Sequence, residues 1–418
     1  MVLCTNNSKA PTMLAGADWI IENTKMKIEM SGLRAFAVVA ISGLALWAPI
    51  NVVADVMKMD QAKYTALKSF ADKRLRETKI PGAGLGIIKD GKVIFAGGFG
   101  ARDLSTGEAV NSQTAYLIGS STKSFTSTTM AMLAQDGIVD WDKPVRTYMP
   151  SFGYKDEYVS SRVTLRDLAS HRSGVEDEPE WWGSKLSRGE LVETMNTFEL
   201  NEGFRAKFQY NNAGFMTMGH VVTLMSKRKF EDVVMQRIVK PLGMENTVWS
   251  DLSGPNPPYK ENVSHPHVVE NGKARKVPFE FEGEAIRPSG TLTSNIDDML
   301  KWLKFNLQKG ELNGERLLSR ENHDELITPN MIASYEDGLS REKHAAWQEM
   351  YGLGWFLGNY NGHRGVHHGG SSVGTLSQVF FMPDKNFAVV SFVNVETYLS
   401  DELVLFVIDL YKDELEKP

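Results

Sequence analysis

The chain is organised around the stretch Tyr116-Leu-Ile-Gly-Ser-Ser-Thr-Lys-Ser-Phe-Thr-Ser-Thr-Thr-Met-Ala-Met-Leu-Ala-Gln-Asp-Gly137. Its pattern predicts a helix that opens at Ser120 and ends at Gly137, where a glycine supplies the left-handed C-terminal cap. Ser120 and Lys123 are three residues apart, so they lie on one face of the first turn. Burial and the positive end of the helix dipole both favour a neutral lysine amine there, and that amine could take the serine proton. S-x-x-K alone is common by chance, and a capping serine beside a solvated lysine is the simpler interpretation.

The composition indicates a globular protein with enough apolar residues for a full core. The sequence has 418 residues, of which 42% are hydrophobic, and this length suits one large domain or two medium ones. The formal net charge is −6 and no dense Lys/Arg cluster occurs, so nucleic acid is not an expected partner. The single cysteine, Cys4, excludes an internal disulfide, and there is no C-x-x-C or H-E-x-x-H motif. We therefore expect no metal and no other cofactor.

The N-terminal part contains an expected export signal. Residues 1–25 are polar and mixed, and Lys27 and Arg34 then precede an apolar run over residues 35–50. Val52 and Ala54 fit the small residues that a signal peptidase reads, which predicts a signal peptide over about residues 26–54 with cleavage after Ala54. The alternative is an uncleaved membrane anchor, although the run barely reaches the length that spans a bilayer. We expect a secreted or periplasmic protein with no stable membrane insertion after cleavage.

Apolar periodicity predicts an α+β fold. An amphipathic helix is expected from Asp60 to about Lys79, and Asp90-Gly91 between two apolar runs predicts a β-hairpin. The pattern is mainly helical from Ser120 to about residue 326, and strand-like segments return over residues 352–393. Asp384-Lys-Asn386 is the expected turn between the last two strands, and a final helix is expected over about residues 400–415. These elements predict one antiparallel sheet whose strands come from both ends of the chain.

This pattern divides the chain into two parts. Residues 1–54 form an N-terminal extension with the probable signal peptide, and residues 60–418 form one domain. The sheet part of that domain is expected at about residues 60–119 and 345–418, and the inserted helical part at about residues 120–344. The serine-containing helix begins where the two parts meet.

Two further motifs offer partners for the serine. Phe208-Gln-Tyr-Asn-Asn-Ala-Gly-Phe215 carries Tyr210 and Asn212 two residues apart, on one side of an extended or loop segment. A phenol can relay a proton, and an amide can hold a lysine and a substrate carbonyl together. Val366-His-His-Gly-Gly-Ser-Ser-Val-Gly374 places His368 at the expected end of a strand, beside glycines whose bare backbone would let a substrate lie close. Each motif taken alone is more simply a turn or a surface strand.

Taken in order, S-x-x-K, Tyr-x-Asn and His-x-Gly resemble the motifs of the penicillin-recognising serine hydrolases, specifically the class C β-lactamase-like family. That family includes DD-peptidases, carboxylesterases and D-amino-acid peptidases. The resemblance covers about residues 60–415 and extends to four supporting stretches, Val163-Thr-Leu-Arg-Asp-Leu-Ala-Ser-His-Arg-Ser-Gly174, Pro241-Leu-Gly-Met244, Pro288-Ser-Gly-Thr-Leu-Thr-Ser294 and Tyr351-Gly-Leu-Gly-Trp355. It implies a β-lactamase/transpeptidase-like antiparallel sheet flanked by N- and C-terminal helices, with an inserted, mainly helical region.

The resemblance also implies roles for the residues of the first two motifs. Ser120 would be the acylated nucleophile and Lys123 its base. Tyr210 would relay the proton to and from the leaving group, and Asn212 would orient the lysine and the substrate. His171, in the first supporting stretch, corresponds to a packing residue.

The third motif would complete the site. The backbone N–H of Ser371 would form the oxyanion hole together with that of the nucleophile. Gly369 and Gly370 would line the substrate site. Trp181 and Trp182 could line it as well, or could equally be packing residues.

One departure from the family changes the expected substrate. True class C β-lactamases carry Lys-Thr-Gly at the third motif, whereas this chain carries His368, Gly369 and Gly370. With an ordinary imidazole pKa of about 6.5, His368 would lose its proton between about pH 6 and 8 and would hold a substrate carboxylate weakly at neutral pH. We therefore expect an esterase or peptidase rather than an efficient β-lactamase. The glutamate that class A enzymes use for deacylation has no counterpart, which would leave water activation to Tyr210 and Lys123.

The sequence therefore predicts a secreted acyl-serine hydrolase whose partner is a small ester, amide or peptide substrate. The rival interpretation is a catalytically silent protein that binds penicillin or peptidoglycan, or acts as a scaffold. The intact S-x-x-K and Tyr-x-Asn motifs argue against this rival, because a retired site has no reason to keep these groups. The sequence predicts no particular oligomeric state.

Overall fold

The computed structural model describes residues 59–176, 183–249, 252, 261–280, 283–333, 350–360 and 362–416. All of them belong to one unit, which spans Val52–Pro418. The predicted export signal with its cleavage site, and the pair Trp181 and Trp182, lie outside the described residues. No helix among those described combines the length and the apolar character needed to cross a membrane.

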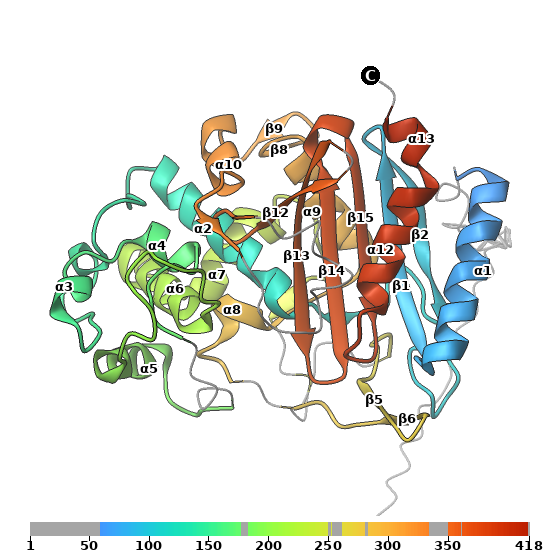
Figure 1. The fold of residues 1–418 in the computed structure, drawn as a ribbon, viewed down its shortest axis with the longest axis horizontal. Helices are drawn as coiled ribbons and strands as arrows, with labels where there is room; N and C mark the ends of the chain where they lie inside the picture. Colours follow the sequence, from blue (N-terminus) through green and yellow to red (C-terminus); the bar gives the residue numbers. More distant parts are fainter. Residues whose placement is uncertain are drawn as a thin grey trace, which may run out of the picture. The chain divides into compact units, whose positions relative to one another are not determined.

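The main sheet combines strands from the two ends of the domain (Figure 1). In the described part of the chain it has eight strands, in the order β10 (Met331–Ile332), β11 (Met350–Tyr351), β12 (Phe356–Tyr360), β13 (His363–Ser372), β14 (Thr375–Met382), β15 (Phe387–Val393), β1 (Gly82–Lys89) and β2 (Lys92–Gly100). All neighbouring strands pair antiparallel. The N-terminal hairpin thus joins the C-terminal strands through β1 and β15, which confirms the predicted sheet.

Residues with left-handed backbone make two of its turns. Asp90 and Gly91 have φ values of 51° and 72° between β1 and β2, which confirms the predicted hairpin. Asn386, with φ of 47°, follows a 3₁₀ turn over Pro383–Lys385 and leads into β15, again as predicted. These turns fix the register, and alternate side chains therefore face opposite sides of the sheet.

The sheet is a middle layer between two hydrophobic cores. On β15, Phe387 and Val389 belong to one core, and Ala388 and Val390 belong to the other. The first core is covered by α1 (Gln61–Thr78), α12 (Leu399–Leu410) and α13 (Lys412–Leu415), and the second by α9 (Ile296–Leu307) and the helical region (Figure 1). Burial on both faces explains why β15 is apolar except at Ser391.

The two flanking helical segments differ in how well the sequence predicted them. Asp60 caps α1 by accepting hydrogen bonds from two backbone N–H groups, and Lys79 ends it with φ of 62°, which matches the predicted bounds. The final helix, in contrast, is interrupted at Tyr411 and forms two helices, α12 and α13. The sequence predicted one continuous helix there.

The helical region lies between β2 and the C-terminal strands. Its helices are α2 (Thr122–Gln135), α3 (Glu157–Ser160), α4 (Leu165–Ala169), α5 (Arg188–Thr194), α6 (Asn212–Ser226), α7 (Phe230–Val234), α8 (Arg287–Gly290), α9 and α10 (Arg320–Leu326). It also contains a small sheet of β3 (Tyr116–Leu117), β7 (Leu292–Ser294) and β4 (Val248–Trp249), and the hairpins β5 (His267–Glu270) with β6 (Lys273–Lys276) and β8 (Glu311–Leu312) with β9 (Glu315–Arg316). The sequence predicted none of these short strands, because they are too short for a periodic pattern.

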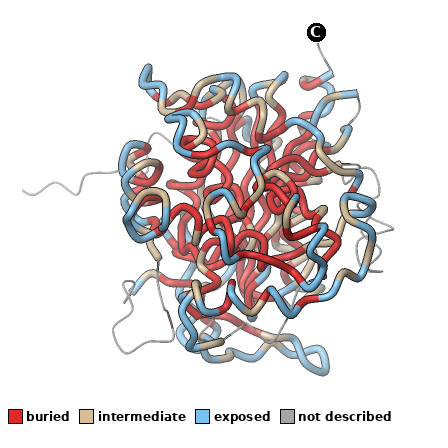
Figure 2. The backbone as a smooth tube through the Cα atoms, turned by 90° about the vertical axis from the view of Figure 1, so that its left-hand side faces the viewer, coloured by how far each residue is buried: buried red, intermediate tan, exposed pale blue. Residues whose placement is uncertain are grey.

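The helix α2 forms the interior of this region. Every residue from Thr122 to Leu133 is buried, although many of them are serine or threonine, and Figure 2 shows buried segments gathered inside the molecule. The start of the helix differs from the prediction, because Gly119–Ser121 forms a 3₁₀ turn and α2 begins at Thr122, two residues after the predicted start at Ser120. Gly137 has φ of 71° after the helix, as predicted.

Candidate active site

Ser120 lies in the 3₁₀ turn that connects β3 to α2. Gly119 has φ of 50°, and a Cβ atom there would lie 2.5 Å from the carbonyl oxygen and 2.7 Å from the nitrogen of Ser371. Only glycine fits both this backbone and this close approach. The turn therefore holds Ser120, which is partly exposed, directly against strand β13.

The neighbouring serines of the motif are committed to structural hydrogen bonds. The Ser121 hydroxyl donates to the carbonyl of His368 at 3.1 Å and lies 2.9 Å from the Ser377 hydroxyl. The Ser124 hydroxyl donates to the Ser121 carbonyl at 2.7 Å. Both side chains are buried, so Ser120 is the serine of this stretch that a substrate can reach.

Lys123 is completely buried beneath Ser120. Its Nζ lies 2.9 Å from Ser120 Oγ, 2.6 Å from Asn212 Oδ1 and 2.8 Å from the backbone oxygen of Ser289. The Asn212 and Ser289 oxygens can only accept hydrogen bonds, so two N–H groups of the lysine point toward them. The third position on Nζ faces the serine hydroxyl, where it can hold either a lone pair or a proton.

Tyr210 covers the other side of the lysine. The Lys123 Nζ lies 4.7 Å from the centre of the tyrosine ring. Tyr210 immediately precedes Asn211, whose Oδ1 caps helix α6 by accepting from the Gly214 N–H at 2.7 Å. The cap fixes the chain direction so that residues 210 and 212 both reach the lysine. Ser120, Lys123, Tyr210 and Asn212, which the sequence placed in one site, thus lie together.

His171 supports Tyr210 from behind. The two rings stack with centroids 4.4 Å apart, and His171 Nδ1 accepts a hydrogen bond from the Asn211 N–H at 3.0 Å. Burial, together with the nearby charge of Lys123, holds the pKa of His171 well below its ordinary value, so the ring is neutral. The packing role predicted for this residue agrees with its position.

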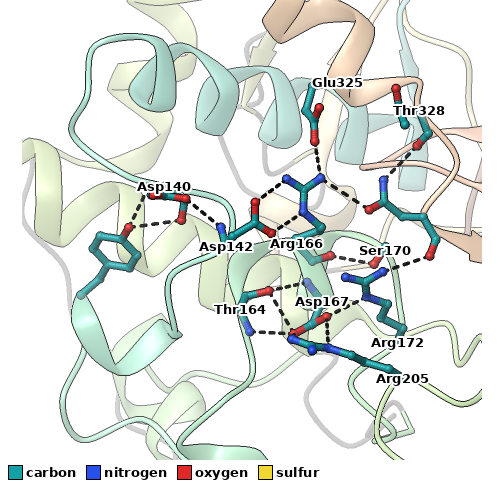
Figure 3. Close-up of polar contacts among 12 residues, drawn as sticks. Asp140, Asp142, Thr164, Arg166, Asp167, Ser170, Arg172, Arg205, Glu325 and Thr328 are labelled. Carbon is teal, nitrogen blue, oxygen red and sulfur yellow. Dashed lines mark hydrogen bonds and ion pairs between the residues drawn. The ribbon is translucent and has the colours of Figure 1, made fainter.

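An ionic network centred on the buried Asp167 holds the loops that carry His171 and Tyr210 (Figure 3). The Asp167 carboxylate accepts from Arg172 Nε at 2.7 Å, and from Arg205 Nε at 2.9 Å and Nη2 at 2.7 Å. Backbone hydrogen bonds then join the loops directly, from the Arg205 N–H to the Arg172 carbonyl at 2.9 Å and from the Gln209 N–H to the His171 carbonyl at 2.8 Å. Asp167 thereby ties α4 to the segment that ends at Tyr210.

A second branch of the network in Figure 3 reaches toward the sheet edge. Arg166 forms two hydrogen bonds to the Asp142 carboxylate, at 2.6 and 2.8 Å, and also contacts Glu325 of α10. Arg172 Nη1 donates to the Asn330 carbonyl at 3.0 Å, immediately before β10. These contacts connect the helical region to the residue before β10, the edge strand of the sheet that carries the third motif.

His368 on β13 is buried and neutral. Its Nε2 lies 3.0 Å from the Tyr351 hydroxyl, and its Nδ1 lies 2.5 Å from the Gly369 carbonyl. Because the carbonyl can only accept, Nδ1 carries the proton and Nε2 accepts from the tyrosine. Burial first, and then the charge of Lys123, lower the pKa of His368 to about 3. The expectation that this residue titrates between pH 6 and 8 is therefore wrong, because the side chain is not solvated as the sequence reasoning assumed.

Gly370 of the third motif makes a close contact within the protein that the sequence did not predict. Strand β13 does not end at His368 but continues to Ser372. A Cβ on Gly370 would lie 2.0 Å from the Ile118 carbonyl oxygen and 2.6 Å from the Ser120 nitrogen. Gly370 thus admits the protein's own nucleophile turn. The contact places the backbone nitrogens of Ser120 and Ser371, the predicted oxyanion donors, on two segments that touch.

Two contributors to the site had no assigned role in the sequence analysis. The Ser289 carbonyl, from α8, accepts from Lys123, and the Tyr351 hydroxyl contacts His368. Both residues fall in supporting stretches of the family resemblance, which was the available signal. A carbonyl contact depends on backbone position rather than on side-chain identity, so no residue type could reveal it.

Known proteins with similar sequences cover most of this chain. The unguisins hydrolase ungD' of Aspergillus campestris is 24% identical over 344 residues, which are 79% of this chain and 62% of that protein. Protein flp of Staphylococcus aureus is 23% identical over 338 residues, 79% of this chain and 63% of that protein. The matched part thus spans somewhat under two thirds of the length of these relatives.

Solved structures share the fold. The octameric penicillin-binding protein homologue from Pyrococcus abyssi superposes with a TM-score of 0.71 and 25% identity, covering 85% of this chain and 78% of that chain. The D-amino acid amidase from Ochrobactrum anthropi SV3, complexed with L-phenylalanine amide, gives a TM-score of 0.70 at 20% identity, covering 84% of this chain and 99% of that chain. The family model described as Beta-lactamase matches residues 67–409. The protein therefore belongs to the beta-lactamase family.

Proposed function

We propose that the protein is a serine hydrolase that cleaves an ester or amide through an acyl-enzyme on Ser120. The supporting observation is the environment of Lys123 Nζ. The oxygens of Asn212 and Ser289 accept two of its N–H groups, and Ser120 Oγ lies 2.9 Å from Nζ. A neutral amine has two N–H groups and one lone pair, so in this arrangement the lone pair points at the serine hydroxyl. This is the geometry of a nucleophile with its general base.

Acylation follows from these positions. Ser120 Oγ attacks the substrate carbonyl carbon while its proton passes to Lys123 Nζ. The oxyanion that forms lies between the backbone N–H groups of Ser120 and Ser371, and each donor is worth on the order of 10² to 10³ in rate. Tyr210 passes the proton from the lysine side of the site to the departing oxygen or nitrogen, which leaves as an alcohol or amine.

Deacylation reverses the proton path. A water molecule attacks the acyl carbon, and its proton passes by way of Tyr210 to Lys123. The bond between Ser120 Oγ and the acyl carbon then breaks, and the serine recovers a proton from the lysine. The proposed steps use only these residues and water.

The third motif favours esterase or amidase activity over efficient β-lactam hydrolysis. β-Lactams carry a carboxylate, and a lysine would offer it a charged partner, whereas His368 is neutral and its Nε2 is taken by Tyr351. The similar proteins include one named a D-amino acid amidase and one named a hydrolase, which supports hydrolysis as the reaction. We also propose export directed by residues 26–54, to be tested by N-terminal sequencing of protein from an envelope fraction.

A labelling experiment separates the enzyme from a silent binding protein. Wild-type protein should form a covalent adduct with a fluorescent phosphonate, and a separate, unlabelled sample should turn over a p-nitrophenyl ester. Ser120→Ala should lose both properties, whereas Ser121→Ala should still label, because Ser121 is buried under the turn. Labelling that survives in Ser120→Ala but not in Ser121→Ala would show that another serine is the nucleophile. Absence of labelling and turnover in the wild type would favour the binding protein.

A further inference from the structure

An exposed carboxylate lies beside the strand that carries the predicted oxyanion donor. The Ser371 hydroxyl donates a hydrogen bond to Glu396 Oε1. Both residues are exposed, unlike the buried lysine and histidine of the site. Glu396 comes from a different part of the chain, the segment that follows β15, and none of the sequence motifs included it.

The backbone that carries Glu396 is fixed. The preceding Asn394 is fully buried, and its side chain accepts from the Gly82 N–H at 2.9 Å and donates to the Ala101 carbonyl at 2.9 Å. The Asn394 carbonyl accepts from the His267 N–H at 3.1 Å, and Val395 is buried in the core between the sheet and α1. Glu396 therefore projects from an anchored segment rather than from a freely moving loop.

The Ser371 side chain lies between the Glu396 carboxylate and the proposed reaction centre. A Cβ atom on Gly119 would lie 2.7 Å from the Ser371 nitrogen, so residue 371 borders the nucleophile turn. A substrate carbonyl bound by the N–H groups of Ser120 and Ser371 would place its neighbouring substituents near the side chain of residue 371. Glu396 is thus positioned to meet a group next to the scissile bond.

The charge of Glu396 is not neutralised within the protein. Among the described residues, no lysine or arginine forms an ion pair with it. Lys123 is buried beneath Ser120, within hydrogen-bond distance of oxygens of Ser120, Asn212 and Ser289. His368 carries no charge at neutral pH. The exposed border of the site at β13 is therefore negative, whereas a lysine at the third motif would make it positive.

We propose that Glu396 determines the charge preference of the site, favouring esters and amides that carry an ammonium group beside the scissile carbonyl and disfavouring those with a carboxylate there. This inference rests on the proposed hydrolase function and assigns a substrate class to it. A partly exposed ion pair of this kind is expected to change kcat/KM by roughly 3-fold to 10-fold relative to a neutral substrate, and a carboxylate should lower it by a similar factor.

The test uses two matched substrate series. The first is alanine p-nitroanilide in both enantiomers, with its amino group free, acetylated or succinylated, which gives a positive, a neutral and a negative acyl part. The second is N-acetylalanine joined to ethylenediamine, ethanolamine or glycine, which places the same three charges in the leaving group. The expected result is the order positive, neutral, negative in at least one series, with a spread that shrinks as salt is added.

Glu396→Gln should abolish that order while leaving turnover of the neutral substrates close to wild type. Glu199→Gln, which removes an exposed carboxylate paired with Lys155 elsewhere on the surface, is the matched control and should keep the order. Equal loss of activity on all three substrates would overturn the inference, since it would mean that Glu396 only supports Ser371. An unchanged order in Glu396→Gln would overturn it too. Absence of Ser120-dependent turnover on every substrate would instead refute the hydrolase itself.

Discussion

Two buried charged groups, Lys123 and Asp167, are stabilised in different ways in this molecule. Asp167 is held by opposite charges, because Arg172 and Arg205 both donate to its carboxylate. Lys123 donates to the uncharged oxygens of Ser120, Asn212 and Ser289. The Asp167 cluster is therefore stable only in its charged form, whereas the environment of the lysine can accept either protonation state.

This difference indicates which cluster can do chemistry. A group held by full counter-charges resists a change in protonation, since losing its charge would leave the partners unpaired. A lysine surrounded by neutral acceptors loses much less when it gives up a proton, which a general base must do in every turnover. The two clusters are nevertheless linked, because the arginines of Asp167 hold the loop that carries Tyr210 over the lysine.

The largest expected effect comes from Lys123→Met, which removes the amine but keeps a side chain of similar length. We expect kcat/KM for an ester to fall by about 10⁴ to 10⁶, because the nucleophile and its base act as a unit. Stability should change much less, within about 2 kcal/mol, since loss of the buried charge offsets the acceptors left without a donor. Kinetics together with urea unfolding would check this. If Lys123→Met were strongly destabilised while its folded fraction kept full activity, Lys123 would be a structural residue and not the catalytic base.

Asp167→Asn should produce the opposite pattern. We expect the free energy of unfolding to fall by about 3 kcal/mol, because the buried Asp167 loses its charge and the mostly buried Arg172 loses its counter-charge, whereas the exposed Arg205 contributes less. Asp142→Asn is the control, because the Asp142 carboxylate that pairs with Arg166 is exposed, and it should cost less than about 1 kcal/mol. A loss of activity in Asp167→Asn without a loss of stability would show that the network acts on the chemistry directly.

The protonation of Asp167 should also make the stability of the protein depend on pH. Burial alone raises the pKa of the Asp167 carboxyl, but hydrogen bonds from Arg205 and Arg172 outweigh it and hold this pKa below its ordinary value. A lowered folded-state pKa contributes stability above the unfolded value, near pH 4, and this contribution disappears as the pH falls further. The thermal unfolding temperature should therefore fall more steeply below about pH 4 in the wild type than in Asp167→Asn. Parallel curves would contradict this assignment.

Tyr351→Phe tests the buried contact of His368 and should have a smaller effect. The variant leaves His368 Nε2 without the tyrosine hydroxyl at 3.0 Å, which should cost about 1 kcal/mol in stability. Activity should decrease by no more than several-fold, because neither group touches the reacting atoms in the proposed mechanism. Thermal unfolding and ester kinetics measure both quantities, and a loss of 100-fold or more in kcat would show that Tyr351 takes part in catalysis.

The smallest expected effect is the absence of a titration. Because His368 has a pKa of about 3, it stays neutral from pH 6 to 8 and should add no step to the pH profile of kcat/KM in that range. The profiles of the wild type and of His368→Gln should therefore have the same shape between pH 6 and 8. A step near pH 6.5 that the variant lacks would mean that the histidine is solvated in solution.

Much of the architecture follows from local sequence. The hairpin at Asp90 and Gly91, the helix bounded by Asp60 and Lys79, and the turn before Phe387 could be predicted because each depends on the preferences of a few adjacent residues. The break at Tyr411 and the strands β3, β4 and β7 could not, because they depend on packing against distant segments. The serine, lysine, tyrosine and asparagine of the site could be named because their order and spacing matched a family.

What only the tertiary structure decided is the environment of those residues. The sequence specified an imidazole at His368 but not its burial, which displaces its pKa from the range assumed for it. It specified Gly370 but not that the backbone of Ile118 and Ser120 would fill the space of a side chain there. It placed no acidic group at the site, although Glu396 contacts Ser371. Proton affinity, close packing and electrostatic field all depend on atoms brought together from distant parts of the chain, so residue identity alone could not determine them.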